Sequence, residues 1–295
     1  MHRKALKRWA LALTFWLALH ASSLRAQIFT APLQASTTGT NPVDFEFRAD
    51  GTLIAKGNDG VGSLLTADQG VGARMLWFPA KEAFRAGLID SFTSDAWNLA
   101  NIGQCSVAFG RDTTASGYGS MASGDNSSAS GYSSTAFGVF TFASGYASTV
   151  FGQSTTASGS EATAFGVLTT ASGNESTTFG MVTTASGDAS IAFGSGTTAS
   201  GYASAALGGS TTASAQFSFV IGSNNVGGGS STTWVDGDPL FEIGNGSGTG
   251  ATPLKDALVV YKNGSSTFQG PITASAGVFT TPASVATTDI PMFGN

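Results

Sequence analysis

Residues 169–180 read TTASGNESTTFG, and residues 183–194 read TTASGDASIAFG. The sequence motif that begins at Thr169 therefore begins again at Thr183, with glycine at the same positions within it. From Gly103 to Gly222 a glycine stands at every seventh position, and only Ala215 interrupts this series. A period this strict marks an internal repeat, and the repeat decides the fold.

The residue before each glycine alternates between two classes, so the true repeat is a double one, made of two unequal halves. In one half this residue is serine. In the other it is bulky, with Ser123 as the departure: Phe109, Phe137, Phe151, Phe165, Phe179, Phe193, Leu207 and Ile221. We expect these bulky residues to form a core ladder, a column of stacked rings along one inner wall of the fold.

A helical coiled coil is excluded because glycine costs up to about 1 kcal/mol at each helical position. Two short strands per repeat remain, each ended by a glycine in a conformation closed to other residues. The turn glycines of the bulky half are Gly110, Gly138, Gly152, Gly166, Gly180 and Gly194. Stacked repeats of this kind predict an all-β fold, a parallel β-solenoid with about 4.8 Å between coils. Proline is absent between Pro79 and Pro239, as a continuous ladder requires.

One double repeat makes one coil of the solenoid. A coil this short has an interior only one side chain wide. Its burial barely offsets the entropy of ordering the chain. Association of several solenoids would bury the apolar wall that is left over. We therefore expect an oligomer, with three chains as the leading choice.

The segments SVAFG (106–110), STAFG (134–138), ATAFG (162–166) and SIAFG (190–194) alternate with TTASG segments such as 155–159. This pattern, which extends from Gly103 to Gly222, resembles the head repeats of trimeric autotransporter adhesins (YadA-like heads, Hep_Hag-type repeats). The resemblance implies a left-handed parallel β-roll that assembles as a homotrimer. It also implies adhesion, with a host or matrix protein or a glycan as receptor.

The chain departs from that family pattern in three respects. Phenylalanine stands where the family usually has isoleucine or valine, and no heptad-patterned stalk follows the repeats. The C-terminal segment TTPASVATTDIPMFGN (280–295) lacks the long amphipathic strands of the family's membrane anchor. We therefore expect no transmembrane anchor in this sequence.

Residues 1–26 have the layout of a secretory signal peptide, with a basic start and an apolar run from Trp9 to Leu19. We expect export to the cell surface, in association with the outer membrane, or to the extracellular space. Cleavage after Ala26 removes five of the 13 basic residues and none of the 18 acidic ones, leaving a net charge of −10. An acidic chain argues against nucleic acid as a partner.

The flanks of the repeats predict small modules. Residues 45–57 and 258–270 both alternate like strands, around an Asp-Gly and an Asn-Gly turn respectively, which predicts two related β-hairpins. Between the first hairpin and the repeats, Pro79 and Gly87 predict the start and the cap of a short helix. Trp77, Phe78, Phe84 and Trp97 would form the core of this adaptor and cover the open end of the first coil.

Four segments follow from this organisation. They are a signal peptide (1–26), a hairpin and helical adaptor (27–102), the β-roll (103–222) and a C-terminal β-strand module with a tail (223–295). Within the last segment, DPLFEIGNG (238–246) also resembles strand-rich modules of phage tail-fibre-like surface proteins.

Enzymatic chemistry is not expected. Both histidines, His2 and His20, lie in the signal peptide, so the mature chain lacks a Ser-His-Asp triad and a histidine zinc site. We expect no metal, cofactor or catalytic residue. Cys105 is the single cysteine, which excludes an intrachain disulfide.

A second hypothesis concerns the recurring Thr-Thr pairs. Their first members form a possible ligand face for a repetitive ligand such as ice or a glycan lattice: Thr155, Thr169, Thr183, Thr197 and Thr211. Neighbours in a strand face opposite sides, so one member of each pair should point outward. The alternatives are a threonine-rich face that serves only β propensity, and a purely structural fibre segment.

Overall fold

The computed structural model describes residues 44–47, 53–56, 71–90, 95–249 and 254–270. The predicted signal peptide and the tail beyond residue 270 lie outside the described residues. Within these ranges the chain forms strands and two single-turn 3-10 helices, η2 (Pro79–Lys81) and η3 (Leu99–Asn101). Its contacts divide it into two compact units, one ending at Met181 and the other beginning at Val182.

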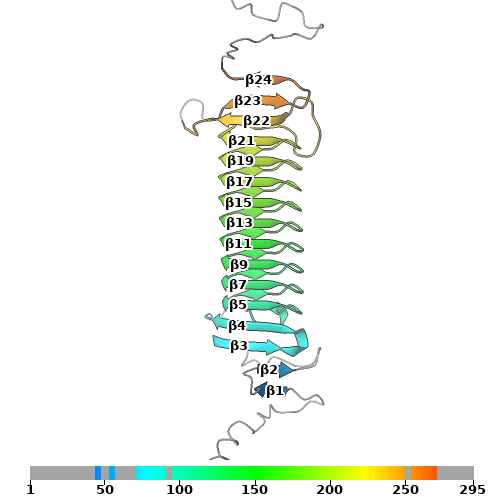
Figure 1. Ribbon diagram of the computed structural model, residues 1–295, viewed down its shortest axis with the longest axis vertical. Helices are drawn as coiled ribbons and strands as arrows, with labels where there is room; N and C mark the ends of the chain where they lie inside the picture. Colours follow the sequence, from blue (N-terminus) through cyan, green and yellow to red (C-terminus); the bar gives the residue numbers. More distant parts are fainter. Residues whose placement is uncertain (1–43, 48–52, 57–70, 91–94, 250–253, 271–295) are drawn as a thin grey trace, which may run out of the picture. The chain divides into compact units, whose positions relative to one another are not determined.

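In the first unit, long strands alternate with short ones along the chain. Long strands stack in parallel on long strands, and short strands on short strands (Figure 1). The register is one full repeat, so that Phe151 lies beside both Phe137 and Phe165. The strands are β5 (Val107–Arg111), β6 (Thr114–Ala115), β7 (Met121–Asp125), β8 (Ser128–Ala129), β9 (Thr135–Val139), β10 (Phe142–Ala143), β11 (Thr149–Gln153), β12 (Thr156–Ala157), β13 (Thr163–Val167), β14 (Thr170–Ala171) and β15 (Thr177–Met181). The predicted parallel β-solenoid is confirmed.

The second unit begins with the same stacked coils and ends with strands that pair differently. Its coils comprise β16 (Thr184–Ala185), β17 (Ile191–Ser195), β18 (Thr198–Ala199), β19 (Ala205–Gly209), β20 (Thr212–Ala213) and β21 (Phe219–Ser223). A loop then leads to β22 (Pro239–Asn245), which pairs in parallel with β21 and places Gly244 beside Gly222. The antiparallel strands β23 (Asp256–Tyr261) and β24 (Ser266–Phe268) follow. Gly264 donates its N–H to Tyr261 O at 2.9 Å, which confirms the hairpin predicted around Asn-Gly.

The adaptor before the repeats is a β-hairpin. The prediction of a helix between Pro79 and Gly87 is wrong: β3 (Gly72–Phe78) and β4 (Ala83–Ile89) pair antiparallel, and Pro79 begins only the single turn of η2. Gly87 lies beside Gly110 in the register of β4 with β5, so it belongs to the glycine column of the solenoid. The upstream hairpin of β1 (Asp44–Phe47) and β2 (Leu53–Lys56) is confirmed, although its Asp-Gly turn lies outside the described residues.

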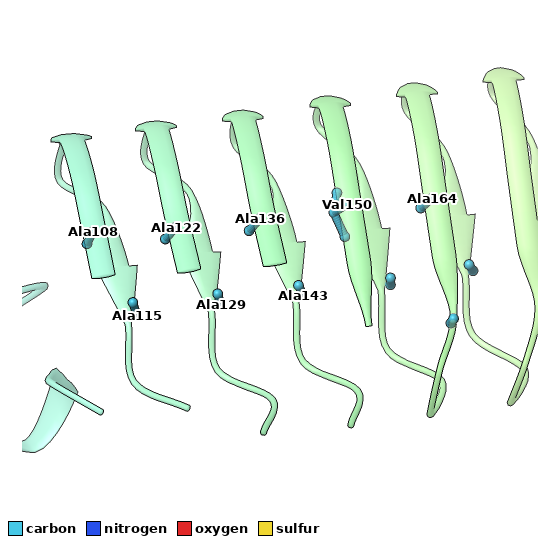
Figure 2. Close-up of a cluster of buried hydrophobic side chains, with 11 residues drawn as sticks. Ala108, Ala115, Ala122, Ala129, Ala136, Ala143, Val150 and Ala164 are labelled. Atoms are coloured by element: carbon cyan, nitrogen blue, oxygen red, sulfur yellow. The ribbon is translucent and has the colours of Figure 1, made fainter. Parts of the chain in front are cut away.

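The interior of the coils is filled by alanine, and the predicted inner ladder of phenylalanines is wrong. Ala108, Ala122 and Ala136 from the long strands face the short strands in the first unit (Figure 2), and all are fully buried. Phe109 is 41% exposed and Phe179 is 50% exposed, because successive side chains of a strand point to opposite sides. The two walls of a coil lie so close together that they admit small side chains, mostly alanine with some serine, threonine and valine, and not rings.

The glycines of the bulky half take the conformation predicted for them. Their φ values lie in the region that favours glycine, for example +132° at Gly138 and +137° at Gly152. They occupy the fourth position of each long strand and not a turn, which corrects the expected location. A Cβ on Gly152 would lie 1.9 Å from the carbonyl oxygen of Gly166 in the next coil. Close approach of successive coils therefore requires glycine here.

The coil corners use the left-handed backbone conformation, mostly without glycine. The corner after each long strand is occupied by residues as different as Asn126 (φ 51°), Leu168 (φ 57°) and Gly196 (φ 67°). The N–H of most corner residues bonds to the preceding coil, as Leu168 N does to Gln153 O at 2.9 Å. These bonds hold bulky residues in a conformation that costs them about 1–2 kcal/mol.

We expect Leu168→Asn to stabilise the protein by about 0.5–1 kcal/mol, because asparagine tolerates this conformation. Leu168 is 56% exposed, so little apolar burial is lost. Thermal or denaturant unfolding measures the change. The reciprocal variant Asn126→Leu, at the equivalent corner, should lower the stability by a similar amount. Equal stability of all three proteins would contradict this account of the corners.

The open end of the first coil is closed by Arg85 and Trp97, both almost fully buried. Arg85 in β4 donates to Ser106 Oγ and to Ala115 O, each at 2.8 Å, and burial lowers its pKa to about 10. Trp97 donates its Nε1–H to Thr113 O at 3.0 Å. Of the four aromatic residues predicted to form the cover, Phe78 and Trp97 are buried, whereas Trp77 is 39% exposed and Phe84 is partly exposed.

Candidate functional site: the outer faces of the coils

The bulky residues form a ladder on the outside of the long strands. In the first unit, ring centroids lie 5.2 Å apart for Phe137 and Phe151 and 4.9 Å apart for Phe151 and Phe165, with nearly parallel planes. Phe165 and Phe179 continue the stack at 6.1 Å. The expected column of stacked rings exists, and its register comes from the period of the double repeat. Its rings face away from the coil interior.

Other outward residues of the same strands extend this apolar surface, which we call the ladder face. In the first unit it comprises the outward side chains of β5, β7, β9, β11, β13 and β15. Val139 (37% exposed), Val167 (40%) and Met181 (53%) lie on it beside the phenylalanines. In the second unit Phe193, Leu207 and Ile221 hold the same positions, and Phe219 stacks on Phe241 at 5.9 Å. A contiguous apolar face of this kind is typical of an interaction surface.

Charges occur at one place on the ladder face, where Arg111 lies between two carboxylates. Arg111 contacts Asp90 at 3.1 Å and forms a two-pronged hydrogen bond with Asp125 in the next coil. The bond to Asp125 raises the pKa of Arg111, and the same bond lowers the pKa of Asp125. All three side chains are at least partly solvated, so they orient each other without contributing much stability.

The threonines predicted as a ligand face lie inside the coils. Thr155, Thr169, Thr183, Thr197 and Thr211 are fully buried, so they cannot contact a ligand. Each follows a left-handed corner that turns its side chain inward. Their partners Thr156 and Thr170 in the first unit, and Thr184, Thr198 and Thr212 in the second, point outward and are half-buried. A regular outer threonine row therefore exists, one residue later than predicted.

A third surface runs along the corner after the short strands. Tyr118, Tyr132 and Tyr146 are each about half-exposed, and their rings stack at 5.0 and 5.4 Å. Cys105 lies beside the first of them, is half-buried, and donates its Sγ–H to Glu82 Oε2 at 2.6 Å. The tyrosine stack was missed from the sequence because tyrosine recurs in only part of the repeats.

An open cavity of about 590 Å³ lies beside the first coils. Its lining includes Asp90, Asp95, Asp112, Phe140 and Phe142. Asp90 is engaged by Arg111, and its own N–H lies 3.4 Å from Asp112 Oδ1. Within the described ranges, no group of three or more His, Cys, Asp or Glu residues is placed to hold a metal ion.

The family comparison agrees with this geometry. The model of the YadA head domain repeat matches in overlapping copies between residues 102 and 225, with copies such as 129–155, 157–181 and 199–225. Over residues 102–225 the chain is similar to the YadA head repeat family. The matched copies coincide with the stacked coils, so the YadA head repeat is the structural element of both units described above. No curated protein matches the chain.

The YadA head repeats account for less than half of the 295 residues. The hairpins β3–β4 and β23–β24 lie outside the matched range and continue the strand pairing beyond it. In the described part of the chain, no helix has the length and apolar character needed to cross a bilayer.

Proposed function

We propose that this protein is a non-enzymatic, adhesin-like protein of the cell surface or the extracellular space, whose YadA head repeats assemble as a homotrimer. The observation that carries the proposal is the ladder face. A row of phenylalanines, several of them from 37% to 50% exposed, would be unfavourable in water as a permanent surface. YadA head repeats form a structural adhesin family, which supports attachment as the role.

The ladder face supports self-association for a second reason. Coils filled with alanine bury little apolar area, so the rings on the outside are the largest apolar groups left to bury. Burial of one such ring is worth about 1.5–3 kcal/mol. Three copies that bring their ladder faces to a common axis would bury the row of rings.

The test is the mass and shape of the purified mature protein, measured by light scattering and sedimentation. We expect an elongated trimer, which then justifies a screen against matrix proteins, glycans and cells. Binding in that screen would support attachment. A folded monomer would overturn the trimer, and a trimer that binds nothing would favour a structural fibre segment.

The outer threonine row gives a second candidate, a binder of a repetitive ligand such as ice or a glycan lattice. Thr184, Thr198 and Thr212 stand in register one coil apart in the second unit, which gives the row a regular spacing. Binding to ice or to a polysaccharide that Thr198→Tyr abolishes would favour this candidate over the adhesin.

A further inference from the structure

The second unit holds two buried carboxyl groups that face each other. Glu242 in β22 is 1% exposed and Asp256 in β23 is 4% exposed. The register places Asp256 beside Gly244, two residues along β22 from Glu242, and the adjacent backbone N–H groups of Val226 and Gly227 each donate to one of the two carboxyl groups. Two ionised carboxylates buried side by side would repel each other, so burial favours a pair that holds one proton.

Three consecutive residues of the loop after β21 donate to this pair. Asn225 Nδ2 and the N–H of Gly227 donate to Glu242 Oε2 at 2.7 and 3.1 Å. The N–H of Val226 donates to Asp256 Oδ1 at 3.1 Å. The carboxyl pair therefore fastens the start of the loop to strands β22 and β23.

The charged groups around the pair are engaged elsewhere. Strand β21 presents Val220 beside Glu242. Just after β23, the Nζ of Lys262 lies 3.6 Å from Asp238 Oδ2 and 5.1 Å from the ring centre of Trp234. Lys255 precedes Asp256 and is half-buried, with its backbone N–H on Asn224 O.

The loop itself adds only Asp236 and Asp238. Asp236 is exposed and accepts from Trp234 Nε1, and Asp238 accepts from Ser230 N at 2.8 Å. Among the described residues, no lysine or arginine contributes to the electrostatics of Glu242 or Asp256. The hydrogen-bond donors to the pair are the uncharged groups of Asn225, Val226 and Gly227.

Further along, the same loop covers a corner of the coils. Ser230 O accepts from Gln216 N and Ser231 O accepts from Tyr202 N, both at 2.8 Å. The ring of Trp234 lies 6.5 Å from that of Phe217. In the fastened loop the two backbone amides are paired, while the rings of Phe217 and Trp234 stay 44% and 52% exposed.

We propose that the Glu242–Asp256 pair is a proton-controlled latch on the loop 225–238. While the shared proton is present, the latch holds the loop against the corner at Tyr202 and Gln216. When the proton leaves, two buried negative charges repel each other and the loop opens. Opening frees the backbone N–H groups of Tyr202 and Gln216 at the edge of the coils.

The direction of the pH dependence follows from burial. Burial raises the pKa of Glu242 and the pKa of Asp256, and the charge of Asp256 raises the pKa of Glu242 further. A carboxyl group with a raised folded-state pKa adds stability below its unfolded-state pKa, and this stability is lost as the pH rises through the folded-state pKa. The latch is closed in acid and opens as the pH rises above the ordinary glutamate range.

Hydrogen exchange of the full-length protein, followed by mass spectrometry from about pH 4 to about pH 8, tests this. Protection of residues 225–238, corrected for intrinsic exchange, should fall about tenfold per pH unit above the folded-state pKa of Glu242. Glu242→Gln keeps a neutral partner for Asp256 and should make protection independent of pH. The control Glu175→Gln, at an exposed carboxyl, should follow the wild-type curve.

Two outcomes would overturn the proposal. One is wild-type protection of the loop that does not change with pH, and the other is a Glu242→Gln protein that still follows the wild-type curve. If Glu242→Gln does not fold, Asp256→Asn removes the neighbouring charge that raises the pKa of Glu242, so the loss of protection should begin at a lower pH than in the wild type.

Discussion

Gly152→Ala is expected to cost more than about 4 kcal/mol of stability. The added Cβ would lie 1.9 Å from Gly166 O and 2.9 Å from its carbonyl carbon, both backbone atoms that cannot turn aside. The φ of +137° adds backbone strain for any residue that carries a Cβ. Relief requires the coils to separate and the ladder of β11 with β13 to break.

Denaturant unfolding followed by circular dichroism measures this loss. The matched control is Gly209→Ala in β19, where the nearest atom to an added Cβ is Ser223 Cβ at 3.9 Å. That variant should stay within about 0.5 kcal/mol of the wild type. A Gly152→Ala protein as stable as the control would show that successive coils do not need glycine for their close approach.

Replacing Phe151 and Phe165 together by serine should convert the proposed trimer into monomers. Each ring contributes about 1.5–3 kcal/mol when it is buried, and every trimer loses both rings from each of its chains. The coil itself should survive, because Ser123 already occupies the equivalent position beside Phe137. Light scattering measures the mass, and circular dichroism shows whether the strands remain.

The control for this experiment is Tyr146→Ser, which removes a ring 55% exposed on the corner instead of the ladder face. It should leave the mass unchanged. A double phenylalanine variant with the same mass as the wild type would place the assembly interface elsewhere. A double variant that loses its β-structure would show that the rings stabilise the coil of a single chain.

Glycine at every seventh position, with serine and a bulky residue alternating before it, was sufficient to predict the strand pairs, their register and the YadA-like repeat. These properties depend on a local pattern that recurs in every repeat, so each repeat supports the same structural prediction. The hairpin around Asn263 and Gly264 was predictable for a similar reason, since a turn signal acts within a few residues. The short segment from Pro79 to Gly87 was not, because its helix signals were overridden by pairing of β4 with β5.

The sequence by itself determined that the repeats form a parallel solenoid and that Phe109, Phe137 and their equivalents stand in one column. It did not determine which side of the wall that column faces, since alternation separates two faces without saying which is inside. Only the tertiary structure decided this, because the closely spaced walls admit Ala108 and Ala115 and leave the rings outside. The burial of Thr155, and the meeting of Glu242 with Asp256, likewise depend on chain segments that come together only after the coils have stacked.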